Sequence, residues 1–146
     1  MKVVFKKVIE LLGEIAELRF VDLDKGQIDF YETRPAVAFP CALIKIDLPQ
    51  CENRNAKVQQ VRCGVSLRVC FGYLGETTAT TPLATRDAAL NYFDVIEKIY
   101  VKLQGTGNTQ INPFTRKSAR EENRQDGLKV FTMNFETGFI DETAKV

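Results

Sequence analysis

The sequence predicts an α+β fold, with one antiparallel sheet of about four strands and two helices packed on one face. Two segments have apolar residues at helical spacing, and two pairs of segments alternate apolar and polar residues as strands do. A length of 146 residues is enough for one hydrophobic core but too short for two. We therefore expect a single domain over residues 1–146, in the order α-β-β-α-β-β, with both strand pairs forming hairpins.

The first element is an amphipathic helix, predicted from Lys2 to about Leu18. Apolar residues recur three and four positions apart at Val4, Val8, Leu11, Ile15 and Leu18. A turn over residues 22–26 follows. It resembles part of a calcium loop, but Thr33 stands where the bidentate glutamate is needed, so we exclude calcium.

The first predicted hairpin begins with residues 35–49, which are apolar on both faces through Ile44. Pro40 lies in the middle of this segment and predicts an edge position or a bulge, since proline cannot donate to a strand ladder. Residues 50–56 are polar and predict a turn.

The second strand, residues 57–73, has the clearest pattern in the chain. Its core face holds Val61, Cys63, Val65, Leu67, Val69 and Phe71, and its other face holds Arg62, Gly64, Ser66, Arg68, Cys70 and Gly72. Such a long alternation is typical of an antiparallel strand with one face in water.

A loop over residues 74–82 and a helix from about Leu83 to Gln104 come next. The predicted apolar stripe of this helix is Ala89, Tyr92, Phe93, Ile96, Ile99, Tyr100 and Leu103. The last hairpin has strands over 111–122 and 128–140, joined by a turn that ends in Asp-Gly. The side chains predicted to face the core are Phe131, Met133, Phe135 and Phe139.

Composition excludes several classes of function. Twenty lysines and arginines against nineteen acidic residues give a net charge of +1, which lacks the basic excess of a general nucleic-acid binder. The chain has no histidine, so every catalytic triad and every metal site that needs an imidazole is excluded. No run of about 18 apolar residues predicts a membrane span, and no secretory signal is visible.

The four cysteines are predicted to be free thiols in a reducing cytoplasm. Cys63 and Cys70 are an odd number of positions apart on one strand, so they face opposite sides of it. They are also about 23 Å apart at the usual rise of a strand, which is beyond disulfide reach. A contact between Cys41 and Cys63 across the hairpin is an open alternative.

The predicted polar face of the sheet is the most informative surface. It carries Arg62, Ser66, Arg68, Thr132, Asn134 and Glu136. Such a face is either the solvent side of the sheet or the lining of an interface or channel. No phosphate loop, nucleophile elbow or metal cluster is present in the sequence. We therefore expect no enzyme activity and no cofactor.

The order of elements resembles the tail-completion or tail-terminator proteins of tailed phages and prophages. The resemblance is carried by the strand end VSLRVCFGYL, the helix ALNYFDVIEKIYVKLQG, the charged hairpin and the closing strand DGLKVFTMNFETGFID, and it extends from the first helix to Asp141. It implies an α+β protein that forms a homo-oligomeric ring, typically hexameric. Such a ring caps the tail tube and joins it to the head, without catalytic residues.

The resemblance further implies that the charged hairpin and the polar sheet face contact other subunits or the tail tube. The candidate interface residues are Arg62, Arg68, Arg116, Lys117, Arg120, Glu121, Glu122 and Arg124. Expected partners are copies of the chain, tail-tube proteins and head-connector proteins, with no specific nucleic acid and no membrane. The expected location is the host cytoplasm during assembly and then the virion. The alternative is a small α+β ligand-binding or regulatory module that dimerises through its sheet.

Overall fold

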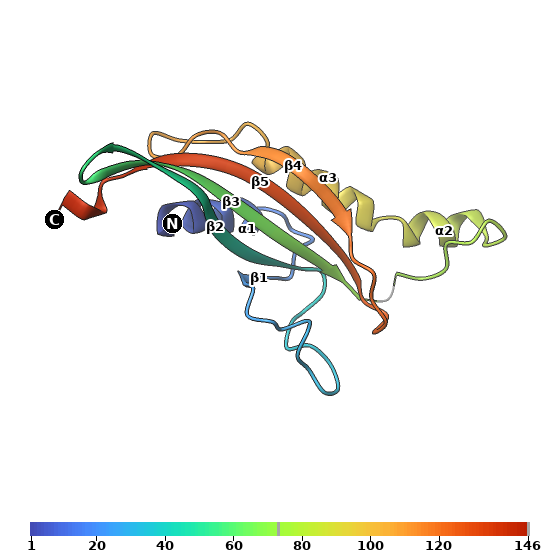
Figure 1. The fold of residues 1–146 in the computed structure, drawn as a ribbon. Helices are drawn as coiled ribbons and strands as arrows, with labels where there is room; N and C mark the ends of the chain where they lie inside the picture. Colours follow the sequence, from blue (N-terminus) through green and yellow to red (C-terminus); the bar gives the residue numbers. More distant parts are fainter. Residues whose placement is uncertain (73, 146) are drawn as a thin grey trace.

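A long, curved sheet forms the body of the computed structural model (Figure 1). The structure describes residues 1–72 and 74–145; Tyr73, the predicted last residue of the second strand, lies outside the described residues. The elements are α1 (Lys2–Gly13), β1 (Phe20–Leu23), β2 (Cys41–Asn55), β3 (Val58–Phe71), α2 (Leu83–Ala89), α3 (Tyr92–Leu103), β4 (Thr115–Glu121), β5 (Lys129–Asp141) and the 3-10 turn η1 (Thr143–Lys145). Within the described residues the strand order is β1-β2-β3-β5-β4. The predicted α+β class is confirmed.

The sheet has one more strand than the sequence predicts. The additional strand, β1, is short and pairs in parallel with the start of β2, Phe20 lying opposite Cys41. The sheet is therefore mixed, and the prediction of a wholly antiparallel sheet is wrong. Residues 24–40 connect β1 to β2, and this long segment supplies the crossover that a parallel pair requires.

The first hairpin lies further along the chain than its apolar pattern indicates. β2 begins directly after Pro40 and continues to Asn55, so the predicted turn at residues 50–56 is mostly strand. The register against β3 shifts between Asp47 and Gln50. That irregularity contains Pro49, so Pro49, not Pro40, is the proline placed at a bulge.

Both predicted helices are shorter than their apolar stripes. α1 ends at Gly13, although Ile15 beyond it is still buried. The second predicted helix is interrupted at Leu90 and Asn91, which separate α2 from α3. At the start of α3, Tyr92 is buried whereas Phe93 is 44% exposed. The predicted core position of Phe93 is therefore wrong.

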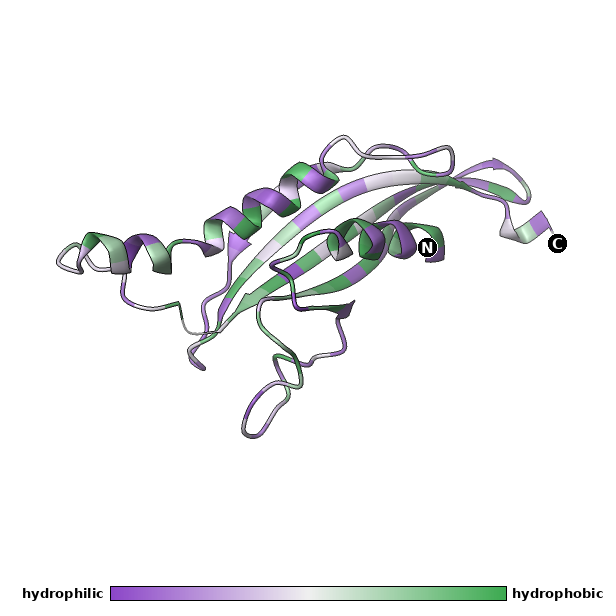
Figure 2. Cartoon of the chain, turned by 180° about the vertical axis from the view of Figure 1, so that it is seen from behind, coloured by the Kyte–Doolittle hydropathy of each residue, from purple (hydrophilic) through white to green (hydrophobic). Residues whose placement is uncertain are grey.

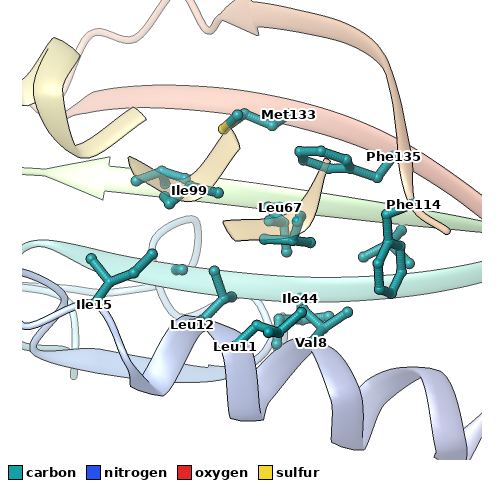
Figure 3. Close-up of a cluster of buried hydrophobic side chains, with 14 of the residues drawn as sticks. Val8, Leu11, Leu12, Ile15, Ile44, Leu67, Ile99, Phe114, Met133 and Phe135 are labelled. Atoms are coloured by element: carbon teal, nitrogen blue, oxygen red, sulfur yellow. The ribbon is translucent and has the colours of Figure 1, made fainter. Parts of the chain in front are cut away.

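The main core lies between the sheet and the two helices α1 and α3 (Figure 3). Val8 and Leu12 of α1 belong to the same buried cluster as Ile99 of α3. The sheet contributes side chains from its three central strands, namely Ile44, Val65, Leu67, Met133 and Phe135. The alternation predicted for β3 and β5 is confirmed, and bands of apolar and polar residues follow one another along the strands in Figure 2.

A second, smaller core lies on the opposite face of the sheet. It contains Ile28, Cys41, Leu43, Cys70 and Val130, with Phe20, Val37, Phe39 and Leu128 packed at its margin. Ile28 and Val37 come from the 24–40 segment, which therefore covers one end of the face predicted to be polar. This end of the sheet has apolar layers on both sides.

The cysteines have the environments of free thiols. Among the described residues none of the four cysteines forms a disulfide, and Cys51 is the one of the four that is exposed. Cys63 lies in the main core and Cys70 in the second core, so the prediction that they face opposite sides of β3 is confirmed. Cys41 lies opposite Cys70 across the β2–β3 pair, and not opposite Cys63.

Truncating two phenylalanines will distinguish the observed core from the one that the sequence predicts. Phe135 is 2% exposed, so Phe135→Ala should lower the free energy of unfolding by about 3–5 kcal/mol. Phe93→Ala should lower it by less than about 1 kcal/mol, because nearly half of the ring is already in water. Urea denaturation of both variants measures these values. Equal losses at the two positions would contradict the exposed position of Phe93.

Candidate assembly interface

The polar face of the sheet carries a cluster of ion pairs centred on Arg68 of β3. Its guanidinium donates to both carboxylate oxygens of Asp29, at 2.6 and 3.0 Å. It also donates to both oxygens of Glu122, at 2.8 and 2.9 Å, and lies 3.4 Å from Asp24. The Arg68 side chain is only 17% exposed. One arginine thus joins the 24–40 segment, β3 and the turn after β4.

A second arginine completes this group. Arg124 Nη1 lies 3.2 Å from both Asp29 and Glu122, and its Nη2 lies 2.7 Å from Asp126. Arg124 also donates to the backbone carbonyl of Ile28. We call Arg68, Arg124 and the four carboxylates of Asp24, Asp29, Glu122 and Asp126 the arginine cluster.

The two arginines lower the pKa values of Asp29, Glu122 and Asp126. Side-chain hydrogen bonds from Arg68 are the main cause that lowers the pKa of Asp29 and of Glu122, and desolvation opposes them. The hydrogen bond from Arg124 likewise lowers the pKa of Asp126 well below its usual range. Charge-assisted and bidentate pairs of this kind are stronger than neutral hydrogen bonds. The cluster therefore holds together segments that are far apart in the sequence.

Three of the eight candidate interface residues belong to this cluster. Arg68, Glu122 and Arg124 satisfy one another and Asp29 within the chain, and the Arg124 side chain is only 11% exposed. Reversing the charge of Arg124 would therefore disturb the subunit itself. The structure places these residues where they hold the fold together.

The other five candidates are more accessible. Arg62 forms an exposed pair with Glu136 at 3.3 Å, Glu121 pairs with Lys129, and Arg116 lies over the Tyr100 ring at 4.0 Å from its centre. Lys117 and Arg120 are exposed on the edge strand β4, and neither forms an ion pair with any residue that the structure describes. Charges of this kind on an edge strand also hinder unselective strand pairing.

A shallow polar hollow of about 240 Å³ lies beside these residues. Its lining includes Arg62, Lys117, Glu52 and Glu136, so it presents both charges. Within residues 1–72 and 74–145, no group of three or more cysteine, aspartate or glutamate side chains could hold a metal ion. No helix in the same part of the chain is both long and apolar enough to cross a membrane.

Two of the acidic partners of Arg68 and Arg124, namely Asp24 and Asp29, were missed by sequence reasoning. Asp24 and Asp29 lie about 40 residues before Arg68 in an irregular segment, and no periodic pattern marks them. The acidic residues of the 22–26 turn are the one signal in this segment, and their spacing indicates calcium ligands, not partners of arginine.

Substituting Arg68 will show what the cluster contributes to stability. Arg68→Gln should lower the free energy of unfolding at pH 7 by about 1–3 kcal/mol, a value reduced for the partial exposure of its partners. The exposed Arg62→Gln is the matched control and should cost less than about 1 kcal/mol.

The pH dependence of the same variants gives a second readout. Depressed carboxylate pKa values stabilise the folded state above the unfolded pKa, and this stabilisation is lost as the pH falls through the folded values. The stability of the parent chain should therefore fall below about pH 5, and Arg68→Gln should fall less steeply. Urea melts between pH 7 and pH 3 in which the two chains have the same slope would contradict this account.

Comparisons with known proteins identify a related fold. No family model matches the chain, and no curated protein sequence matches it. A solved structure described as the virion of a native gene transfer agent (GTA) particle contains a chain with 11% sequence identity and a TM-score of 0.54. The match covers 94% of this chain and 92% of that chain. The protein therefore has the fold of a chain found in a virion particle.

Proposed function

We propose that the chain is a structural protein of a phage-like particle, and that it acts as a tail terminator or head–tail joining protein. The observation that carries this proposal is the fold shared with a gene transfer agent virion chain over nearly the full length of both chains. In this role the protein assembles in the host cell, remains in the particle and performs no catalysis. Its partners are copies of itself and the proteins of the tail tube and the head connector.

The shape of the subunit supports a role in assembly. The 24–40 segment extends from one side of the sheet, and α2 projects beyond the end of the strands (Figure 1). The 24–40 segment and α2 therefore give the subunit two projecting surfaces that differ from each other. Contacts between unlike surfaces of identical chains are heterologous, and they close into a ring when the rotation allows it.

The exposed cations of β4 are proposed to help set the register of this ring. Lys117 and Arg120 are available for acidic groups on a neighbouring subunit or on the tail tube. Exposed charge pairs act on specificity and association rate more than on affinity, and salt screens them. Assembly should therefore weaken as the salt concentration rises.

The test measures the assembly state at low and at high salt. Light scattering coupled to size exclusion should find closed oligomers at low salt, and electron microscopy should show rings, with six copies as the typical number in the resembled family. The double variant Lys117→Glu, Arg120→Glu should weaken assembly without changing the melting temperature of the subunit.

Reversing Lys2 and Lys6 on the exposed side of α1 is the matched control, since it changes the net charge by the same amount. A closed dimer that is insensitive to salt would instead favour a regulatory module that dimerises through its sheet. A strict monomer, with no rings even when tail-tube protein is added, would reject the ring.

A further inference from the structure

Phe30 is the most exposed large apolar side chain among the described residues, at 87%. It ends a tight turn in which the backbone N–H groups of Asp29 and Phe30 both donate to the Gly26 carbonyl, at 3.0 Å. Gly26 has a φ of +81°, and a Cβ there would lie 2.6 Å from the Phe30 ring. Glycine at this position therefore lets the ring lie against the backbone of the turn with its outer side in water.

Single exposed apolar residues are common on protein surfaces. Phe30 differs from them because both of its neighbours in the chain are held by contacts with distant residues. Its preceding neighbour, Asp29, is held by both arginines of the arginine cluster. Its following neighbour, Tyr31, donates its hydroxyl to Asp126 at 2.7 Å. The residues on both sides of Phe30 are thus held by side-chain contacts, and the Phe30 side chain points into solvent, away from the core of its own subunit.

An apolar pocket of about 540 Å³ lies elsewhere on the subunit, where α2 meets α3 at the end of β3. Its lining is mainly aromatic and aliphatic and includes Phe39, Phe71, Leu74, Ala88, Tyr92 and Val95. The rings of Phe71 and Tyr92 meet edge to face, with centres 5.5 Å apart. Apolar pockets with aromatic walls accept a further aromatic ring in the same geometry.

We propose that Phe30 of one copy of the chain inserts into this pocket of a second copy. The inference rests on the proposed assembly function and names one contact between subunits. Phe30 does not reach its own pocket, because Asp29 and Tyr31 fix it on the polar side of the sheet. The occupant is therefore another molecule.

Charge supports a second copy as the occupant. Glu32 follows Phe30 two residues further along the chain, and the lining of the pocket includes Arg19. Both side chains belong to exposed residues, and neither forms an ion pair within the described part of the chain. The pocket is also lined by Glu17, but this carboxylate pairs with Lys98. The exposed ring and the apolar pocket thus each have a charge beside them, of opposite sign.

The ring and the pocket are different surfaces of one subunit, so in a ring the contact between neighbours is heterologous. Each copy can give Phe30 to one neighbour and accept Phe30 from another. Repetition of one such contact generates a ring or an open chain of subunits. A variant that lacks either half can still use the other half, which makes the proposal testable by mixing.

The experiment uses three single variants of the full chain and sedimentation velocity. Phe30→Ser removes the ring, and Ala88→Arg places a long charged side chain at the pocket. Val101→Ser is the control, since it removes another exposed apolar side chain, 74% exposed, from the outer side of α3. All three should melt at the temperature of the parent chain, because none of the residues is buried.

The parent chain and Val101→Ser should assemble alike. Phe30→Ser and Ala88→Arg should each raise the apparent dissociation constant roughly ten- to hundredfold, as expected for losing one buried aromatic side chain. An equimolar mixture of these two variants should form one-to-one dimers and no larger species, because only one complementary pair of surfaces remains.

Failure of this inference is distinct from failure of the proposed ring. If both variants assemble like the parent chain, or if the mixture stays monomeric, the Phe30 contact is wrong and the ring proposal stands. If the parent chain forms only a closed dimer that both variants weaken, the contact is upheld and the ring is rejected. A parent chain that remains monomeric at about millimolar concentration overturns both.

Discussion

The arginine cluster is the interaction on which the polar side of this molecule depends. Arg68 and Arg124 connect the irregular 24–40 segment to β3 and to the turn between β4 and β5. Without these pairs, the segment would no longer be held against the second core, in which Ile28 packs with Cys41 and Cys70. The same pairs hold Phe30 outward. One electrostatic group thus connects the packing of this end of the sheet to the surface proposed for assembly.

Local periodicity predicted the centre of the fold and failed at its margins. The alternation of β3 and β5 was readable because both strands keep one face against the helices along most of their length. The parallel strand β1 was missed because four residues carry too little pattern, and its pairing with β2 depends on a distant segment. The break at Leu90 and Asn91 was missed because apolar residues at helical spacing continue across it, although α2 ends at Ala89 and α3 begins at Tyr92.

The sequence predicts where the candidate site lies, but it does not predict which of its charged residues pair within the chain. The sequence indicates a charged hairpin and a polar sheet face. The structure confirms the charged hairpin, whereas the sheet face is polar only in part, because the second core covers one end of it. It assigns Arg68 and Arg124 to intramolecular pairs, because their acidic partners come from a segment without periodicity. Phe30 gives no periodic signal, since it is an isolated phenylalanine in an irregular segment. Exposure is decided by tertiary anchoring, which single-sequence patterns do not encode.

The central claim is that the arginine cluster orders the turn that presents Phe30. Amide hydrogen exchange in the parent chain and in Arg68→Gln tests it most directly, because the Asp29 and Phe30 amides both donate to Gly26 within that turn. We expect these two amides to be protected in the parent chain and to lose protection in Arg68→Gln, while the amides of α1 and β5 keep theirs. Unchanged protection of Asp29 and Phe30 in the variant would contradict the claim.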